Sequence, residues 1–332
     1  MTIPVTPERI MQFAWSYVPP LILEAAIRHH IFDILDSGPR TVQEIHKETE
    51  ASERGLTAIM NALVGLNFLA KDQQGCFSLT PESAAFLVST KPSFQGGLIR
   101  HTSEQLLPNW LQLNKVVATG EPAEPVNQQG PGSEFFKHFV NDIFPMSYPA
   151  AQQLAAHLAL SGPASVLDLA AGSGVWGIAI AQSSPHVRVT AVDWPGVLPI
   201  TRETVARFGL SDRFTFSPGD LLEADFGSGH IAATLGHILH SEGETRSKAL
   251  LKKVFQALAP GATISIAEFL VNADRTGPVS SLIFAVNMLV NTETGNTYSF
   301  EEISQWLHDA GFTEARTLPG PGPSPLILAT KP

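Results

Sequence analysis

The sequence contains one cysteine, few basic residues for its length and no long apolar run. Its single cysteine, Cys76, excludes a disulfide within the chain and fits a reducing compartment, so we expect a cytoplasmic protein. The 21 Lys and Arg residues against 31 Asp and Glu residues leave a net charge of −10, whereas nucleic acids and anionic membranes bind basic surfaces. No segment reaches the roughly 18 apolar residues of a membrane-spanning helix, and the N-terminus lacks a secretory signal pattern. We therefore expect neither a nucleic-acid nor a membrane partner.

The first third of the chain predicts helices followed by a winged helix. Residues 6–36 carry wide apolar faces at helical spacing, and residues 40–90 predict two short helices and a hairpin wing. Winged helices often bind DNA, but the second of these helices carries a single basic residue, Arg54. DNA binding depends on phosphate contacts from Lys and Arg. A dimerisation platform that also forms a pocket wall is therefore the favoured interpretation.

Residues 165–194 predict a strand, a glycine-rich turn, a helix and a second strand. The turn Ala171–Gly174 contains only small residues, which let a ligand approach the backbone closely. The turn opens a helix, whose free N–H groups favour negative charge, and Asp193 ends the second strand where it can accept hydrogen bonds from ribose hydroxyls. Strands and helices continue to alternate beyond this unit. We therefore predict an α/β fold with a doubly wound, Rossmann-like sheet and ligand sites at the carboxyl ends of its strands.

The glycine pattern alone does not distinguish NAD from S-adenosylmethionine (SAM). Gly172, Gly174 and Gly177 match G-x-G-x-x-G, which both kinds of enzyme use, and a βαβ unit without a ligand is a third interpretation. Asp168, just before the turn, favours SAM. Its carboxylate would repel a pyrophosphate and attract the ammonium group of a methionine.

A second acidic segment also favours SAM. Gly219, Asp220 and Leu221 follow the third predicted strand, where Asp220 can reach an adenine amino group and Leu221 can pack on the ring. Trp194, directly after Asp193, is another candidate neighbour of the adenine.

Five short segments resemble class I SAM-dependent methyltransferases: VLDLAAGSG, AVDW, SPGDLLE, ILHSEGE and SIAEF, in this order and spacing. More narrowly, they resemble the bacterial form of the caffeate and hydroxyindole O-methyltransferases. The resemblance implies SAM as methyl donor, an aromatic or polyketide-like methyl acceptor, and a homodimer formed by the N-terminal helices. We accordingly expect a winged-helix-like dimerisation domain over residues 1–105, a helical linker and pocket wall over 106–160, and a SAM-binding methyltransferase domain over 161–332.

His240 and Glu268 are the candidate catalytic pair. His240 follows the fourth predicted strand and Glu268 lies near the end of the fifth, so neighbouring strand ends would bring them within reach of each other. From position alone, a histidine bonded to backbone is an equally open interpretation. The resemblance places His240 at the family's catalytic histidine, which acts as general base, and Glu268 at an acid that orients the ring. We expect no metal site.

The acceptor pocket is predicted with less support from the residues themselves. A core role is the alternative for each aromatic residue, and Thr297 stands where plant-like members have a second acid. Methylation of nitrogen or carbon, or a SAM-binding protein with other chemistry, therefore stays open. The pocket residues that we predict are Trp110, Phe144, Met146, Phe284, Met288 and Asn291.

Overall fold

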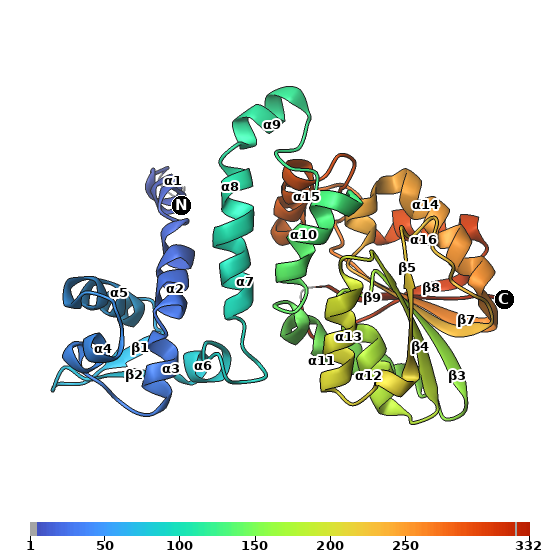
Figure 1. Cartoon of the computed structure of the whole chain (residues 1–332). Helices are drawn as coiled ribbons and strands as arrows, with labels where there is room; N and C mark the ends of the chain where they lie inside the picture. The colour runs from blue at the N-terminus through green and yellow to red at the C-terminus, as the bar shows by residue number, and fades with distance from the viewer. Residues whose placement is uncertain (1–4, 323) are drawn as a thin grey trace. The chain divides into compact units, whose positions relative to one another are not determined.

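The computed structural model describes residues 5–322 and 324–332 of the chain. The chain divides into two compact units, Met1–Pro108 and Asn109–Pro332, which are coloured blue to cyan and cyan to red in Figure 1. The helices of residues 109–160 thus belong to the same unit as the large sheet.

The first unit contains short helices and one antiparallel hairpin. Some of its helices begin at side-chain caps: Thr41 and Glu44 form a reciprocal capping box, and Ser52 caps the next helix. The elements are α1 (Glu8–Ala14), α2 (Val18–Arg28), α3 (Ile31–Asp36), α4 (Val42–Glu48), α5 (Glu53–Gly65), β1 (Leu69–Lys71), β2 (Phe77–Leu79), α6 (Pro81–Phe86), α7 (Gly96–His101) and a π-helical turn, Thr102–Leu106.

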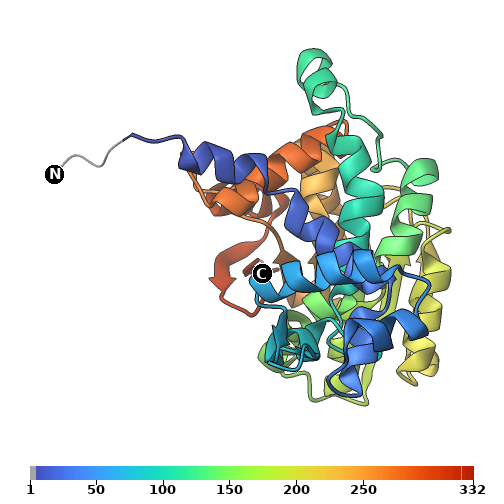
Figure 2. The ribbon, with the colours of Figure 1, turned by 90° about the vertical axis from the view of Figure 1, so that its left-hand side faces the viewer.

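Helices α2 to α5 and the hairpin share one core, whereas α1 packs on none of it. Phe32, Ile45 and Met60 are among the fully buried members of that core. By contrast α1 has no buried residue, and Phe13 next to its end is 68% exposed. Figure 2 shows α1 leading away from α2 toward the N-terminus. This helix therefore presents an uncovered apolar surface.

One stretch, Glu8–Arg28, is long and apolar enough to cross a membrane by length and composition. Our expectation that no such segment exists was therefore wrong. The stretch is interrupted between α1 and α2, and a single helix of this kind near an N-terminus is weak support for a membrane span.

The second unit is built on one sheet in which the described strands have the order β5-β4-β3-β6-β7-β9-β8. Strands β3 to β7 are parallel, and β9 is antiparallel to both β7 and β8. The strands are β3 (Ala164–Leu169), β4 (Val187–Asp193), β5 (Phe214–Pro218), β6 (His230–Gly236), β7 (Leu258–Ala267), β8 (Thr313–Leu318) and β9 (Leu326–Thr330).

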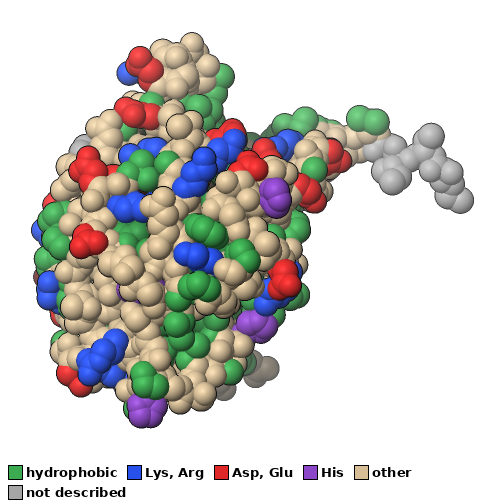
Figure 3. All heavy atoms as spheres, turned by 90° about the vertical axis from the view of Figure 1, so that its right-hand side faces the viewer, with side chains coloured by type: hydrophobic (Ala, Val, Ile, Leu, Met, Phe, Trp, Pro, Cys, Tyr) green, Lys and Arg blue, Asp and Glu red, His purple; other side chains and the backbone are tan. Residues whose placement is uncertain are grey.

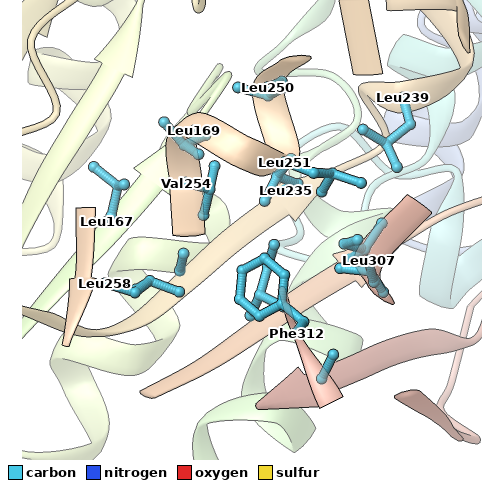
Figure 4. Close-up of a cluster of buried hydrophobic side chains, with 14 of the residues drawn as sticks. Leu167, Leu169, Leu235, Leu239, Leu250, Leu251, Val254, Leu258, Leu307 and Phe312 are labelled. Atoms are coloured by element: carbon cyan, nitrogen blue, oxygen red, sulfur yellow. The ribbon is translucent and has the colours of Figure 1, made fainter. Parts of the chain in front are cut away.

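Helices connect these strands and bury their apolar faces. The described helices of this unit are α8 (Leu107–Trp110, which begins in the first unit), α9 (Leu113–Thr119), α10 (Gln129–Phe139), α11 (Phe144–Leu158), α12 (Val175–Ser183), α13 (Leu198–Arg207), α14 (Leu239–Ala257), α15 (Val279–Asn291) and α16 (Phe300–Ala310), with a 3-10 turn at Ser211–Arg213. In Figure 4, Leu251 and Val254 of α14 and Leu307 of α16 meet Leu235 of the sheet and Phe312.

The strand register places the functional segments at one edge of the sheet. Leu169 of β3 pairs with Val192 of β4 and with Leu235 of β6, and Gly236 pairs with Ala267 of β7. The residues that directly follow these pairs therefore lie side by side. This is the carboxyl edge, where open α/β sheets bind ligands.

The face drawn in Figure 3 has basic side chains lying among acidic ones. A mixed arrangement of this kind does not form the concentrated positive field that attracts a phosphate backbone. The absence of a nucleic-acid partner stays a prediction.

We predict that Leu251→Ala lowers the free energy of unfolding of the second unit by about 2–5 kcal/mol, because Leu251 is fully buried and its removal leaves a cavity. Urea unfolding followed by tryptophan fluorescence measures this. Leu111→Ala is the matched control, since Leu111 is 79% exposed and its loss should cost less than about 0.5 kcal/mol. Equal effects of the two changes would contradict the described core.

Candidate active site

Asp193 is held against the glycine turn. Its Oδ2 accepts a hydrogen bond from the N–H of Gly172 at 2.7 Å, and its Oδ1 accepts one from the N–H of Trp194, also at 2.7 Å. Gly172 and Gly174 have positive φ angles of 54° and 78°, which glycine adopts without the strain of a side chain. Burial raises the pKa of Asp193 to about 6. The arrangement keeps a carboxylate at the end of β4, beside the turn.

Asp168 lies in β3, just before the glycine turn, and its carboxylate is bonded within the protein. It is 0% exposed, and its two oxygens accept hydrogen bonds from Thr234 Oγ1 at 2.7 Å and from the N–H of Gly177 at 2.9 Å. Burial raises its pKa to about 7. The contact of Asp168 with a ligand stays a prediction, and in this structure its carboxylate is enclosed and bonded within the protein. It joins β3, β6 and the first turn of α12.

Gly219 lies next to Asp193, and the assignment of Gly219 and Asp220 to the cofactor stays a prediction. The N–H of Gly219 donates to the carbonyl oxygen of Asp193 at 3.0 Å. The carboxylate of Asp220 is paired with Arg246, whose Nη2 lies 2.9 and 2.7 Å from its two oxygens. Nothing in the sequence had indicated that Arg246 pairs with Asp220.

Trp194 and Leu221 differ in what they can offer a ligand. Trp194 is partly exposed, and its ring lies 6.2 Å from that of Phe136 on α10. Leu221 is 6% exposed and belongs to the hydrophobic core cluster under the sheet. The packing of Leu221 on an adenine stays a prediction, since most of its surface packs in the core in this structure.

His240 and Glu268 form a buried hydrogen-bonded pair. His240 Nδ1 lies 2.6 Å from Glu268 Oε1, and the backbone N–H of His240 donates to Glu268 Oε2 at 3.1 Å. Glu268 is 0% exposed, whereas His240 is 8% exposed. Since a carboxylate can only accept, Nδ1 carries the proton and the lone pair of a neutral His240 is on Nε2. The expected proximity of the two residues is present in the structure.

The charge state of this pair follows from its surroundings. Burial tends to raise the pKa of Glu268, but the neighbouring His240 ring, through its charge and hydrogen bond, lowers it below the usual value. His237 stands three residues before His240 in the chain, and burial lowers the pKa of its ring to about 4. Glu268 is therefore a carboxylate, and His237 is a neutral ring bonded to Ser324 Oγ at 2.6 Å.

Aromatic rings enclose the exposed side of His240. The Phe284 ring meets it edge-on at a centroid distance of 4.9 Å, and Phe269 packs on Phe284 at 4.2 Å. Phe269 also lies 5.0 Å from His237. Phe284 is thus placed where we predicted a pocket residue. The rings form an apolar wall beside the catalytic candidate.

A series of side-chain hydrogen bonds holds α15 next to these aromatic rings. Trp110 Nε1 donates to Asn287 Oδ1 at 2.9 Å, and Asn109 Nδ2 donates to Asn291 Oδ1 at 2.8 Å. Asn291 in turn donates to Asn287 Oδ1 at 3.1 Å. Asn291 is 1% exposed and Met288 is 5% exposed, so both act here through packing and hydrogen bonds within the protein.

Phe144 and Met146 lie on α11. Phe144 stacks on Tyr148 at 5.1 Å and on Phe208 at 5.4 Å, next to the end of α13. The role of Phe144 as a pocket residue stays a prediction, and in this structure its ring packs on Tyr148 and Phe208. Met146 is partly buried near the start of the helix, and its pocket role stays a prediction.

The segment with Thr297 holds the backbone of His240. The N–H of Asn296 donates to the carbonyl oxygen of His240 at 2.8 Å. Thr297 is 1% exposed and adds no charge where plant-like members have an acid. Glu268 is therefore the carboxylate bonded to the ring. Among the described residues, no group of three His, Cys, Asp or Glu side chains is arranged to hold a metal ion.

Two family models match the chain. The model of the O-methyltransferase domain covers residues 126–313, and that of the O-methyltransferase dimerisation domain covers residues 11–89. The chain belongs to the SAM-dependent O-methyltransferase family. It is 31% identical over 317 residues to the 3-hydroxy-5-methyl-1-naphthoate 3-O-methyltransferase of Streptomyces sahachiroi, covering 93% of this chain and 91% of that protein.

Solved structures share the fold over the whole chain. A Nostoc punctiforme protein assigned as an O-methyltransferase has a TM-score of 0.91 at 27% identity, covering 99% of this chain and 100% of its own. Human N-acetylserotonin methyltransferase, solved in complex with SAM, has a TM-score of 0.87 at 21% identity, covering 100% and 99%. The predicted family, fold class and methyl donor are therefore confirmed.

We predict that Asp168→Asn removes a pH-dependent part of the stability. The pKa of Asp168 rises from 3.8 to about 7 on folding, so the folded state holds the proton more tightly. The resulting stabilisation is complete below pH 3.8 and is lost as the pH rises to about 7, with a slope of up to about 1.4 kcal/mol per pH unit. Because an amide does not titrate in this range, the stability advantage of the natural protein over the variant should shrink between these pH values. Urea unfolding at several pH values measures it. Parallel curves for the two proteins would contradict this role.

Proposed function

We propose that this O-methyltransferase moves the methyl group of SAM to a hydroxyl of an aromatic or polyketide-like acceptor, with His240 as general base. The observation that carries the proposal is the 2.6 Å contact between His240 Nδ1 and Glu268. It directs the free lone pair of the ring, on Nε2, away from the carboxylate. The 3-hydroxynaphthoate acceptor named for the Streptomyces relative supports the acceptor class.

The residues at the ends of β4 and β5 fit SAM. Asp193 offers a carboxylate beside a turn in which Gly172 and Gly174 have positive φ angles, and a Cβ at Gly174 would lie 3.2 Å from Thr201 Cγ2. Asp220 and Trp194 flank it with an acceptor and a partly exposed ring. We assign Asp193 to the ribose hydroxyls, and Asp220 and Trp194 to the adenine side. When bound, SAM supplies a methyl group that its sulfonium already activates.

The protein's own task is to place the acceptor hydroxyl and remove its proton. A phenol with a pKa of about 10 is mostly protonated at neutral pH, so a base accelerates the transfer, typically by about 10²–10⁴-fold. His240 Nε2 accepts that proton, and the ionised Glu268 stabilises the imidazolium that results. The acceptor packs against Phe284, which orients it, and in-line displacement depends on this alignment.

The apolar side chains next to α1 fit a homodimer. The dimerisation domain spans residues 11–89, and Phe13 and Trp15 within it are 68% and 65% exposed. Surfaces of this kind are rarely left open in soluble proteins. We propose that they pack against a second copy of the chain, and that the enzyme works in the cytoplasm, where its lone cysteine stays reduced.

We predict that His240→Ala lowers kcat for O-methylation by about 10²–10⁴-fold and leaves the affinity for S-adenosylhomocysteine unchanged, because it removes the base and not a cofactor contact. Glu268→Gln should lower kcat by a smaller factor, since the ring keeps a partner but loses the stabilising charge. An acceptor screen of hydroxylated aromatics, with product counted by methyl transfer, measures both.

His308→Ala is the matched control, because that ring is a surface side chain 78% exposed. Full activity of His240→Ala would exclude its role as base and point instead to methylation of nitrogen or carbon. Cofactor binding with no methylated product in any screen would favour non-methylating chemistry.

We predict that Asp193→Ala weakens binding of S-adenosylhomocysteine by about 10-fold or more, because hydrogen bonds to a charged group contribute about 1.5–3 kcal/mol. Calorimetric titration measures the loss. Asp309→Ala, a change at an exposed acid on α16, is the control. Unchanged affinity in Asp193→Ala, with its melting temperature retained, would remove Asp193 from the cofactor site.

A further inference from the structure

The indole of Trp176 covers the carboxyl end of β6. A Cβ added at Gly236, the last residue of that strand, would collide with Trp176 Nε1. Trp176 is 4% exposed, and its ring lies 6.4 Å from that of His237. The nitrogen edge of a buried indole therefore points at the strand end between the glycine turn and the catalytic histidine.

This indole N–H is a donor without an acceptor among the residues that the structure describes. Buried tryptophans usually find a hydrogen-bond partner for this group, as Trp110 does with Asn287. Within the described chain the backbone N–H groups of Val175 and Trp176, which open helix α12, also have no hydrogen-bonded partner. The indole N–H and these two backbone N–H groups all belong to the first turn of α12, and a helix N-terminus carries partial positive charge.

The segments around this part of the site carry no basic side chain. The segments 170–178, 234–241 and 265–270, which surround the ends of β3, β6 and β7, contain neither lysine nor arginine. The pKa of His237, lowered by burial to about 4, keeps that ring neutral. An anion bound here would therefore rely on neutral donors.

The strand order indicates which part of SAM reaches these donors. Asp193 ends β4 on one side of β3, and Gly236 ends β6 on the other side. If Asp193 binds the ribose, as proposed above, the methionine part of SAM extends toward β6. That part carries the ligand's only carboxylate.

We propose that the indole N–H of Trp176 donates a hydrogen bond to the methionine carboxylate of SAM, together with the first N–H groups of α12. Gly236 is then required because any side chain would occupy the place of the indole nitrogen. Trp176 is a cofactor-binding residue in this view, and the inference rests on the proposed function of the same site.

The test compares two ligands that differ in the amino-acid part. S-adenosylhomocysteine carries the carboxylate, whereas 5′-methylthioadenosine keeps the adenine, ribose and sulfur and lacks it. In calorimetric titrations, Trp176→Phe should weaken the binding of S-adenosylhomocysteine by about 10- to 100-fold, the range expected for a hydrogen bond to a charged group. The binding of 5′-methylthioadenosine should be unchanged. Trp306→Phe is the matched control, since Trp306 is 5% exposed and packs on Tyr298 in the core.

Each outcome decides between definite alternatives. Equal weakening of both ligands by Trp176→Phe would show that the indole acts only by packing, and unchanged affinity for both would also overturn the inference. If Trp176→Phe does not fold, Gly236→Ala displaces the same ring and should produce the same selective loss. Failure of the natural protein to bind S-adenosylhomocysteine at all would instead overturn the proposed cofactor site.

Discussion

The buried carboxylate of Asp168 joins the three elements on which the site is built. It belongs to β3, accepts a hydrogen bond from Thr234 on β6, and accepts another from the N–H of Gly177 in the first turn of α12. A residue larger than glycine at position 177 would press on this carboxylate. Two strand ends and a helix start are thus held at fixed spacing, although burial makes the charged form of the acid costly.

The strand ends on the two sides of β3 carry different parts of the site. The ends of β4 and β5 carry two partly buried acids, Asp193 and Asp220, which suit the neutral hydroxyl and amino groups of a nucleoside. The ends of β6 and β7 carry the His240–Glu268 pair inside an aromatic enclosure. The base that we propose, His240, thus lies among apolar rings, where a carboxylate next to an imidazolium has a greater effect than in water.

The sequence indicated where the functional segments lie along the chain, but it did not indicate the directions of their side chains. The glycine turn, Asp193 and the meeting of His240 with Glu268 were predictable, because parallel strands end at one edge and chain order sets the neighbours. Leu221 and Phe144 were assigned to ligands, yet their surfaces pack in a core cluster and against Phe208. The partners Thr234 and Arg246 carried no sequence signal, since each comes from a distant segment.

The sequence by itself determined the alternation of strands and helices, the position of the small-residue turn and the types of the titratable groups, because these depend on local composition and spacing. Tertiary structure alone decided which of those groups are buried, which are already paired and which donors stay free. The fully enclosed Asp168 illustrates the difference, as does the indole of Trp176, which has no hydrogen-bonded partner among the described residues. Burial and pairing are properties of contacts between segments far apart in the chain, and no local pattern encodes them.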